Sequence, residues 1–287
     1  MLRSDPQPQA FTHLNSSSHL AFSSGSFALA YLAQVPAALA IERLIEGHLL
    51  REKSFVRPVL DIGCGDGLFA SMLFDDKIDE GLDYDVKETA RATTAGRYIH
   101  VTTGSATSMP FPDASFATLF SNSVLEHIPG IEQVMSEAFR VLRPGGVFHF
   151  TVPTPRFEEQ SLPHRLLSAM GLKGAAECFG KAYNSFWRHY NVHNLEGWCS
   201  LARAAGFEIQ EAHTYCPPQV ARLNDLLAPF AFPTAITRRV VDRWVVSPRL
   251  REIVLPGLAR ALENWTRTCA KDRDGVLCCV SAVKPLP

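Results

Sequence analysis

The 287-residue sequence lacks a sizeable net charge, a long apolar run and any tract of low complexity. Its 28 Lys and Arg residues stand against 29 Asp and Glu residues, which gives a formal net charge of -1. Because non-specific affinity for nucleic acids depends on clustered basic residues that displace counterions, we expect no nucleic-acid partner. Pro, Arg or Asp interrupts the apolar stretches well before the roughly 20 residues that span a bilayer. We therefore expect no transmembrane helix.

The seven cysteines include no Cys-x-x-Cys pair and no Cys/His spacing typical of a zinc site. An odd set without such pairs argues against a disulfide framework and against a metal site, and it favours a reducing compartment. The first 25 residues hold an acid, prolines and many polar side chains where a secretory signal needs an unbroken apolar core. We expect no signal peptide, no bound metal and a cytoplasmic location.

From Arg57 onward, segments typical of strands and helices alternate, which predicts a parallel sheet. The predicted strands are residues 56–63, 78–85, 97–104, 115–122, 147–153, 207–215 and 275–284. The predicted helices are residues 67–74, 86–95, 129–142 and 195–205. The RPGG sequence at 143–146 is expected to be a turn that ends the third of these helices. Residues 153–193 lose the alternation and are expected to be loop-like with short helical pieces.

The pattern as a whole predicts a doubly wound, Rossmann-like α/β fold with a seven-stranded, mostly parallel sheet. Phe27 to Leu50 has helical spacing, and Pro36 should bend or split that helix. We expect a leader and helical cap at 1–56, a core at 57–215, a helical insertion at 216–274 between strands six and seven, and the last strand at 275–287.

A glycine-rich turn follows the first predicted strand and opens a helix. It places Gly63, Gly65 and Gly67 where a missing Cβ lets the backbone turn tightly and approach a ligand. Asp83 ends the second strand, 20 residues after Gly63, where an acid accepts hydrogen bonds from ribose hydroxyls. A purely structural turn with Asp83 as a helix cap is the alternative. The G-x-G-x-G spacing differs from the dinucleotide pattern, since Leu68 stands in place of the third glycine.

This block resembles motif I of the class I S-adenosylmethionine-dependent methyltransferases. Other markers of that family follow in order: GLDYD at 81–85, the segment 104–128 and the segment 140–153, with a further similarity at 193–209. The resemblance implies S-adenosylmethionine as the cofactor. It places Asp61, Gly63, Cys64 and Gly65 around the methionine end of the cofactor, Asp83 on the ribose, Tyr84 beside the adenine, Ser105 and Ala106 near the adenine amino group, and Ser121 on the cofactor side of strand four.

Methyl transfer needs alignment of the acceptor and a place for its proton, and histidine is the natural proton acceptor near neutral pH. His127 follows strand four at the carboxyl edge, where ligands bind in such folds. His189 lies in the dense segment FWRHYNVHN. We predict His127 and His189 as catalytic residues, and Asn122, Arg188, Tyr190 and His193 as substrate-binding residues. Packing and helix capping are the alternative roles.

The predicted insertion, residues 216–274, carries ten Lys or Arg residues and six acids. An apolar stripe beside three arginines suits a lid, a contact with an anionic bilayer, or a structural cap or oligomer interface. The stripe consists of Ile236, Val240, Val241, Trp244 and Val245, and the arginines are Arg238, Arg239 and Arg243.

Taken together, the sequence predicts a methyltransferase that acts on a hydroxyl, ahead of a carbon or nitrogen, of a small or lipid-linked metabolite. SNSVLEH after strand four lacks the Asn/Asp-Pro-Pro-aromatic box of enzymes that methylate amino groups of DNA. The alternative function is a scaffold or regulatory subunit that binds S-adenosylmethionine or its demethylated product without catalysis. A nicotinamide-dependent oxidoreductase is disfavoured by the glycine spacing and by the lack of a Tyr-x-x-x-Lys pair. The oligomeric state cannot be read from the sequence.

Overall fold

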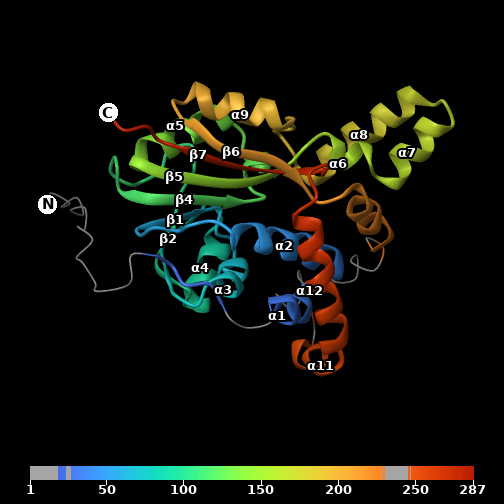
Figure 1. The fold of residues 1–287 in the computed structure, drawn as a ribbon, viewed down its shortest axis with the longest axis horizontal. Helices are drawn as coiled ribbons and strands as arrows, with labels where there is room; N and C mark the ends of the chain where they lie inside the picture. The colour runs from blue at the N-terminus through green and yellow to red at the C-terminus, as the bar shows by residue number, and fades with distance from the viewer. Residues whose placement is uncertain (1–18, 24–26, 228, 230–244, 246) are drawn as a thin grey trace, which may run out of the picture.

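A seven-stranded sheet runs through the molecule in the order β3-β2-β1-β4-β5-β7-β6 (Figure 1). The computed structural model describes residues 19–23, 27–227, 229, 245 and 247–287. Neighbouring strands pair in parallel from β3 to β5, whereas β7 runs antiparallel to both β5 and β6. The strands are β1 Val59–Ile62, β2 Ile78–Asp83, β3 Tyr98–Thr103, β4 Phe116–Asn122, β5 Leu142–Pro153, β6 Glu208–Tyr215 and β7 Leu277–Val283. The predicted sheet is confirmed.

Helices cover both faces of this sheet, as the predicted doubly wound fold requires (Figure 1). The inner strands are buried because α5 and α9 pack on one face, while α1 and α3 contribute to the core on the other. The helices are α1 Phe27–Gln34, α2 Ala37–Leu50, α3 Leu68–Leu73, α4 Val86–Ala95, the short 3-10 helix η1 Leu125–His127, α5 Ile131–Val141, α6 Arg156–Glu159, α7 Leu162–Ala169, α8 Lys173–Trp187, α9 Leu195–Ala204, α11 Pro248–Val254 and α12 Pro256–Ala270. Residues 218–227 are also helical.

The helices before the sheet and those of the predicted insertion pack together, although about 200 residues separate them. Pro36 stands between α1 and α2, as expected from its missing N–H. α12 lies against α2 and α1 (Figure 1). The backbone N–H of Ala28 donates to Glu263 at 3.1 Å, and the His48 ring pairs with the Thr266 hydroxyl at 3.2 Å. The division of the chain into separate units stays a prediction.

The segment 153–193 differs from the loop expected there, because α7 and the 15-residue α8 form a helical hairpin that projects from the sheet (Figure 1). No residue of α7 is buried, and only Ala176 and Gly180 of α8 are. The sequence of α8 does hold apolar residues at helical spacing, Ala176, Phe179 and Tyr183 among them, so the expectation of a loop gave this pattern too little weight.

Two smaller expectations were also wrong. RPGG does not stand outside the strand: it lies within β5, where the register with β4 shifts and Gly145 adopts a φ of +77°. Residues 19–23 of the predicted leader are packed against the core, since Leu20 is buried and the Phe22 ring stacks on Phe74 with centroids 5.3 Å apart. Aromatic burial of this kind outweighs the polar composition around it.

The apolar stripe predicted in the insertion lies outside the described residues, apart from Val245, which is buried. The three arginines beside it also lie outside them. Within the described part of the chain, α11 exposes Leu250, Ile253 and Val254. Among the described residues, the structure has no helix with the length and apolar character to cross a membrane.

Candidate functional site

The glycine loop after β1 is held in the conformation that the sequence predicts. Both Gly63 N–H and Cys64 N–H donate to the Leu82 carbonyl, at 2.7 and 3.0 Å, so the loop folds over the end of β2. A Cβ on Gly63, at a φ of +81°, would lie 2.4 Å from a methyl group of Val124. A Cβ on Gly65 would meet nothing within 4 Å. The loop therefore needs glycine for packing at Gly63 and presents open space at Gly65.

Asp83 fastens the glycine loop to the end of β2. Its Oδ2 accepts a hydrogen bond from Gly65 N–H and its Oδ1 accepts one from Asp85 N–H, both at 2.9 Å. Each carboxylate oxygen keeps a further lone pair, so Asp83 can still accept from a ligand hydroxyl. Tyr84, the next residue, is 76% exposed. An acid with spare acceptor capacity and an unused aromatic ring thus lie beside the open space at Gly65.

Asp61 lies beneath this loop as a buried acid. The Tyr98 hydroxyl donates to its Oδ2 at 2.6 Å. Burial, reinforced by the nearby Asp83 charge and opposed by the Tyr98 hydrogen bond, raises the pKa of Asp61 to about 7. A cationic group brought close would favour the charged form. The residues here therefore fit a cofactor with an amino group, ribose hydroxyls and an adenine ring.

The other residues predicted for the cofactor are already engaged within the protein. The Ser121 hydroxyl donates to the Ile62 carbonyl at 2.9 Å, and Ser105 pairs with the Thr107 hydroxyl at 2.7 Å. Ala106 is buried. Burial also raises the pKa of the Cys64 thiol well above its usual range, so this cysteine is a packing residue without thiolate character.

The end of β4 meets a buried acid that the sequence gave no reason to select. Glu46 of α2 is fully buried and accepts hydrogen bonds from Asn122 Nδ2 at 2.8 Å and Ser123 Oγ at 2.6 Å. Arg43 and the Tyr215 hydroxyl donate to the same carboxylate. Asn122, predicted to face the substrate, is held at both ends of its amide, because its Oδ1 also accepts a hydrogen bond from the Thr151 hydroxyl at 2.9 Å. The helical spacing of α2 marked its apolar face but not this acid.

A second buried acid missed by the sequence analysis is Glu126 in η1. Its side chain is 3% exposed, and its Oε2 has no hydrogen-bond partner among the described residues. Burial, reinforced by Glu46 and Glu42 and opposed by Arg43, raises the pKa of Glu126 to about 8. A search for acids in the LEHI segment could have found it, but its burial depends on elements far away in the sequence.

The two predicted catalytic histidines lie together, with ring centroids 5.1 Å apart. His127 Nδ1 contacts the Arg188 carbonyl at 3.3 Å, and His189 Nδ1 contacts Asn184 Oδ1 at 3.1 Å. Burial lowers the pKa of His127, and burial together with the neighbouring His127 lowers that of His189 to about 4. Both imidazoles are therefore neutral at neutral pH.

The segment after α8 brings some of the predicted substrate residues to this place and others elsewhere. Arg188 ends α8 with a left-handed φ of +57°, and Tyr190 N–H donates to the Glu126 carbonyl at 2.8 Å. Arg188 and Tyr190 are both exposed. His193 instead packs edge-on against the buried Trp198, with ring centroids 5.2 Å apart. Substrate contact by any of the three stays a prediction.

Three side chains at this position have the donor atoms of a metal site. Glu126, His127 and His189 each offer one ligand atom, and these atoms lie within 4.8 Å of one another.

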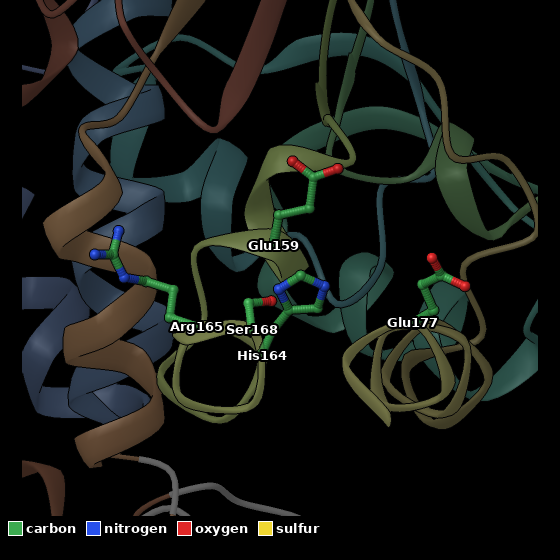
Figure 2. Close-up of a pocket in the computed structure, with 5 residues that line it drawn as sticks. All are labelled: Glu159, His164, Arg165, Ser168 and Glu177. Atoms are coloured by element: carbon green, nitrogen blue, oxygen red, sulfur yellow. The ribbon is translucent and has the colours of Figure 1, made fainter. Parts of the chain in front are cut away.

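A separate pocket of about 460 Å³ opens on the α7–α8 hairpin (Figure 2), where it is lined by Glu159, His164, Arg165, Ser168 and Glu177. None of the predicted site residues lines that pocket.

Comparison with known proteins gives the chain relatives over its central part. Residues 60–150 match the family model described as a methyltransferase domain. A protein of Mycolicibacterium smegmatis named a probable S-adenosylmethionine-dependent methyltransferase is 39% identical over 98 residues, which is 34% of this chain and 38% of that protein. A sterol 24-C-methyltransferase of Yarrowia lipolytica is 35% identical over 131 residues, which is 41% of this chain and 34% of the enzyme. The match thus spans little more than a third of either relative's length.

Among solved structures, the [4+2]-cyclase SpnF superimposes with a TM-score of 0.51 and 20% sequence identity, over 94% of this chain and 88% of the other. At that identity the likeness shows the fold alone. The family match and the named relatives add S-adenosylmethionine as the cofactor of this domain. The glycine loop, the acid at the end of β2 and these similarities agree that residues 60–150 form a methyltransferase domain similar to those of the class I S-adenosylmethionine-dependent enzymes.

Proposed function

We propose that the chain transfers a methyl group from S-adenosylmethionine to a small or lipid-linked acceptor. The observation that carries the proposal is the pairing of Gly65 with Asp83, which leaves open space and spare acceptor capacity together at the carboxyl edge of the sheet. Ligands bind at this edge in open α/β sheets. The named relatives support the same activity.

Each cofactor-binding residue has a distinct part in this proposal. S-adenosylmethionine supplies the methyl group from its sulfonium centre. Asp83 accepts hydrogen bonds from the ribose hydroxyls, and Tyr84 lies beside the adenine. Asp61 balances the amino group of the cofactor, since a neighbouring cation favours its charged form and lowers its raised pKa. The backbone of Gly63, Cys64 and Gly65 gives the close approach that a Cβ would obstruct.

A hydroxyl is the acceptor that the neighbouring residues suit best. Burial lowers the pKa values of His127 and His189, so both imidazoles are neutral at neutral pH. A pKa of about 4 makes His189 a weak base, so in this proposal His127 accepts the proton that the hydroxyl loses. The O–CH3 bond would form as the S–CH3 bond of the cofactor breaks, with its electron pair staying on the sulfur of the departing S-adenosylhomocysteine, and the hydroxyl proton would pass to the His127 imidazole. Asn122, Arg188 and Tyr190 contact the acceptor in this proposal.

A carbon acceptor is the second candidate, favoured by the sterol 24-C-methyltransferase of Yarrowia lipolytica. Methylation of an alkene carbon develops positive charge on the acceptor, and the buried side chain of Glu46 would stabilise that charge. A cofactor whose methyl group carries carbon-13 separates the two candidates, because the product's chemical shift distinguishes O–CH3 from C–CH3.

Contact with a bilayer through 216–274 belongs to the same proposal, since a lipid-linked acceptor must be reached from a membrane. Its support among the described residues is the exposure of Leu250, Ile253 and Val254 on α11. A scaffold that binds the cofactor without catalysis is the competing function. Turnover of any acceptor would exclude it.

Thermal unfolding of the purified chain tests cofactor binding directly. S-adenosylmethionine and S-adenosylhomocysteine at ~100 times their dissociation constants should each add about 2.7 kcal/mol to the free energy of unfolding. NAD and NADP should add nothing. The stabilisation should be lost in Asp83→Ala and kept in Asp85→Ala, because the Asp85 side chain only caps α4 through Lys87 N–H. A response to NAD or NADP, or to no ligand at all, would contradict the proposal.

A further inference from the structure

We propose that Glu126, His127 and His189 form a binding site for a divalent transition-metal cation at the carboxyl edge of the sheet. The seven cysteines gave no sign of such a site, because none of them takes part in it. The proposal rests on three independent features of the described residues: the closeness of the donor atoms, the orientation of the two imidazole rings, and an unpartnered carboxylate oxygen.

The backbone holds the donor atoms close together. Glu126 and His127 are neighbours in η1, and their carboxylate and Nε2 atoms are 3.7 Å apart. The segment that carries His189 is tied to η1 because Tyr190 N–H and Asn191 N–H both donate to the Glu126 carbonyl, at 2.8 and 3.1 Å. The ligand atoms of one cation stand about 3–4 Å apart, given metal–ligand distances of about 2.1 Å. The observed spread of 4.8 Å or less closes to that range by small side-chain rotations.

The rings of both histidines are oriented as metal ligands are. His127 Nδ1 faces the Arg188 carbonyl at 3.3 Å, and His189 Nδ1 faces Asn184 Oδ1 at 3.1 Å. Asn184 is itself fixed, because its Nδ2 donates to Glu158 at 2.9 Å. An imidazole whose Nδ1 bonds an oxygen presents a bare Nε2, and metal-binding histidines share this arrangement.

The third feature is the orphaned oxygen of Glu126. The side chain is 3% exposed, and Oε2 has no partner among the described residues. Arg43, the nearby cation, already donates to Glu46. A buried carboxylate without a counter-charge is costly, and a bound cation would supply that charge.

The donor set selects the class of cation. Two imidazole nitrogens and one carboxylate suit Mn²⁺, Fe²⁺, Co²⁺ or Zn²⁺, whereas Mg²⁺ and Ca²⁺ prefer oxygen ligands alone. Three protein ligands leave a position open, and the His127 side chain is 41% exposed, so an acceptor hydroxyl can reach it. This last step rests on the proposed function: with the cation bound, the histidines act on the hydroxyl through it and not as a free base.

Cobalt titration of the untagged, chelator-treated chain tests the site without any acceptor. Bound Co²⁺ should give visible absorption bands at one equivalent. The bands should be absent in Glu126→Gln, His127→Gln and His189→Gln. Asn184→Ala, which removes the side-chain support of His189 together with the bond to Glu158, should weaken binding about 10–100-fold. His164→Gln is the matched control: it removes a histidine of α7 outside the three and should leave the titration unchanged.

The outcomes separate the site from the proposed function. The site is overturned if cobalt gives no bands, or if the three ligand variants bind as the unaltered chain does. Thermal unfolding of metal-free Glu126→Gln checks folding, because the neutral amide leaves no buried charge and should unfold no earlier than the unaltered chain. Cobalt binding without cofactor binding would sustain the site and contradict the proposed function. Methyl transfer that a chelator leaves unchanged, together with an absence of cobalt bands, would support the proposed function and contradict the metal site.

Discussion

The two halves of the carboxyl edge of the sheet are built in different ways. The half proposed for the cofactor comes from two short segments, the loop at Gly63–Gly65 and the end of β2 at Leu82–Asp85, which the three N–H groups of the loop join. The acceptor half is made of side chains from α2, η1, the end of β4 and the segment after α8. The first is therefore encoded locally, and the second exists only when distant elements have docked.

This difference extends to electrostatics. The acceptor half gathers the buried or largely buried carboxylates of Glu42, Glu46 and Glu126 around Arg43. Burial raises the pKa of Glu42 to about 7 and that of Glu126 to about 8. In a buried cluster with more acids than bases, the loss of a single hydrogen-bond or ion-pair partner leaves a charged or polar group uncompensated in a medium of low dielectric constant. Substitutions there should cost more stability than substitutions in the glycine loop.

Glu46→Ala should have the largest effect. It leaves Arg43 buried without its carboxylate, and it deprives Asn122, Ser123 and Tyr215 of an acceptor. Removing one partner of such a buried pair costs about 3–5 kcal/mol. Urea unfolding should therefore show a loss of that size. Glu52→Ala, at an exposed acid just after α2, serves as the control and should change the unfolding free energy by less than about 0.5 kcal/mol. If Glu46→Ala and Glu52→Ala lost similar amounts of unfolding free energy, the acceptor half would not have the special sensitivity that we expect.

The glycine loop should respond less, and unevenly. Gly63→Ala introduces a Cβ against Val124 at a φ of +81°, and should cost about 2–3 kcal/mol. Gly65→Ala meets nothing within 4 Å and should cost about 1 kcal/mol from its φ of +52° alone. Its methyl group points into the space proposed for the cofactor, so calorimetry should find weakened S-adenosylmethionine binding in a folded protein. Unchanged affinity in Gly65→Ala would place the cofactor elsewhere.

The pH dependence of stability should reveal Glu126 through a smaller, graded effect. Its pKa rises from 4.5 in the unfolded chain to about 8 in the folded chain, so the folded state binds more protons between these values. The contribution of Glu126 to the free energy of unfolding is therefore fully present below pH 4.5 and is lost as the pH rises through 8. The difference in unfolding free energy between the metal-free unaltered chain and Glu126→Gln should therefore fall by at most about 1.4 kcal/mol per pH unit across that window.

Comparing the two proteins cancels the other groups that titrate in the same range, Glu42 and Asp61 among them. If the difference in unfolding free energy stays constant from pH 5 to 8, neighbouring groups offset the burial of the Glu126 carboxylate and its pKa is not raised. Adding the cation should also flatten the difference, since it would hold the carboxylate charged.

Much of the fold could be predicted because its signals are local. The alternation of short apolar strands with helices predicted the sheet, and the helix expected at 195–205 begins where the Asn194 side chain accepts from Gly197 N–H at 2.8 Å. The cofactor half shares this property, since Gly63 and Gly65 mark a turn by their own conformations.

The acceptor half could be predicted only in part. His127 and His189 were selected from local composition and do lie together, but nothing in the sequence indicates that Glu46 or Glu126 joins them. Each acid is buried by contacts with elements far along the chain, and an isolated glutamate in a helix is ordinarily exposed. The helix α8 was missed for a different reason, because the helical spacing of Ala176, Phe179 and Tyr183 is a local signal that was not given enough weight.

The packing of α12 on α2 connects the insertion to the reacting groups. Glu263 and Thr266 of α12 contact Ala28 and His48, and α2 also carries Glu46, which holds Asn122 in place. Among the described residues, α12 thus supports α2, which in turn holds residues proposed for the acceptor. Descendants of this chain could exchange the insertion to recognise new acceptors while inheriting the cofactor half intact.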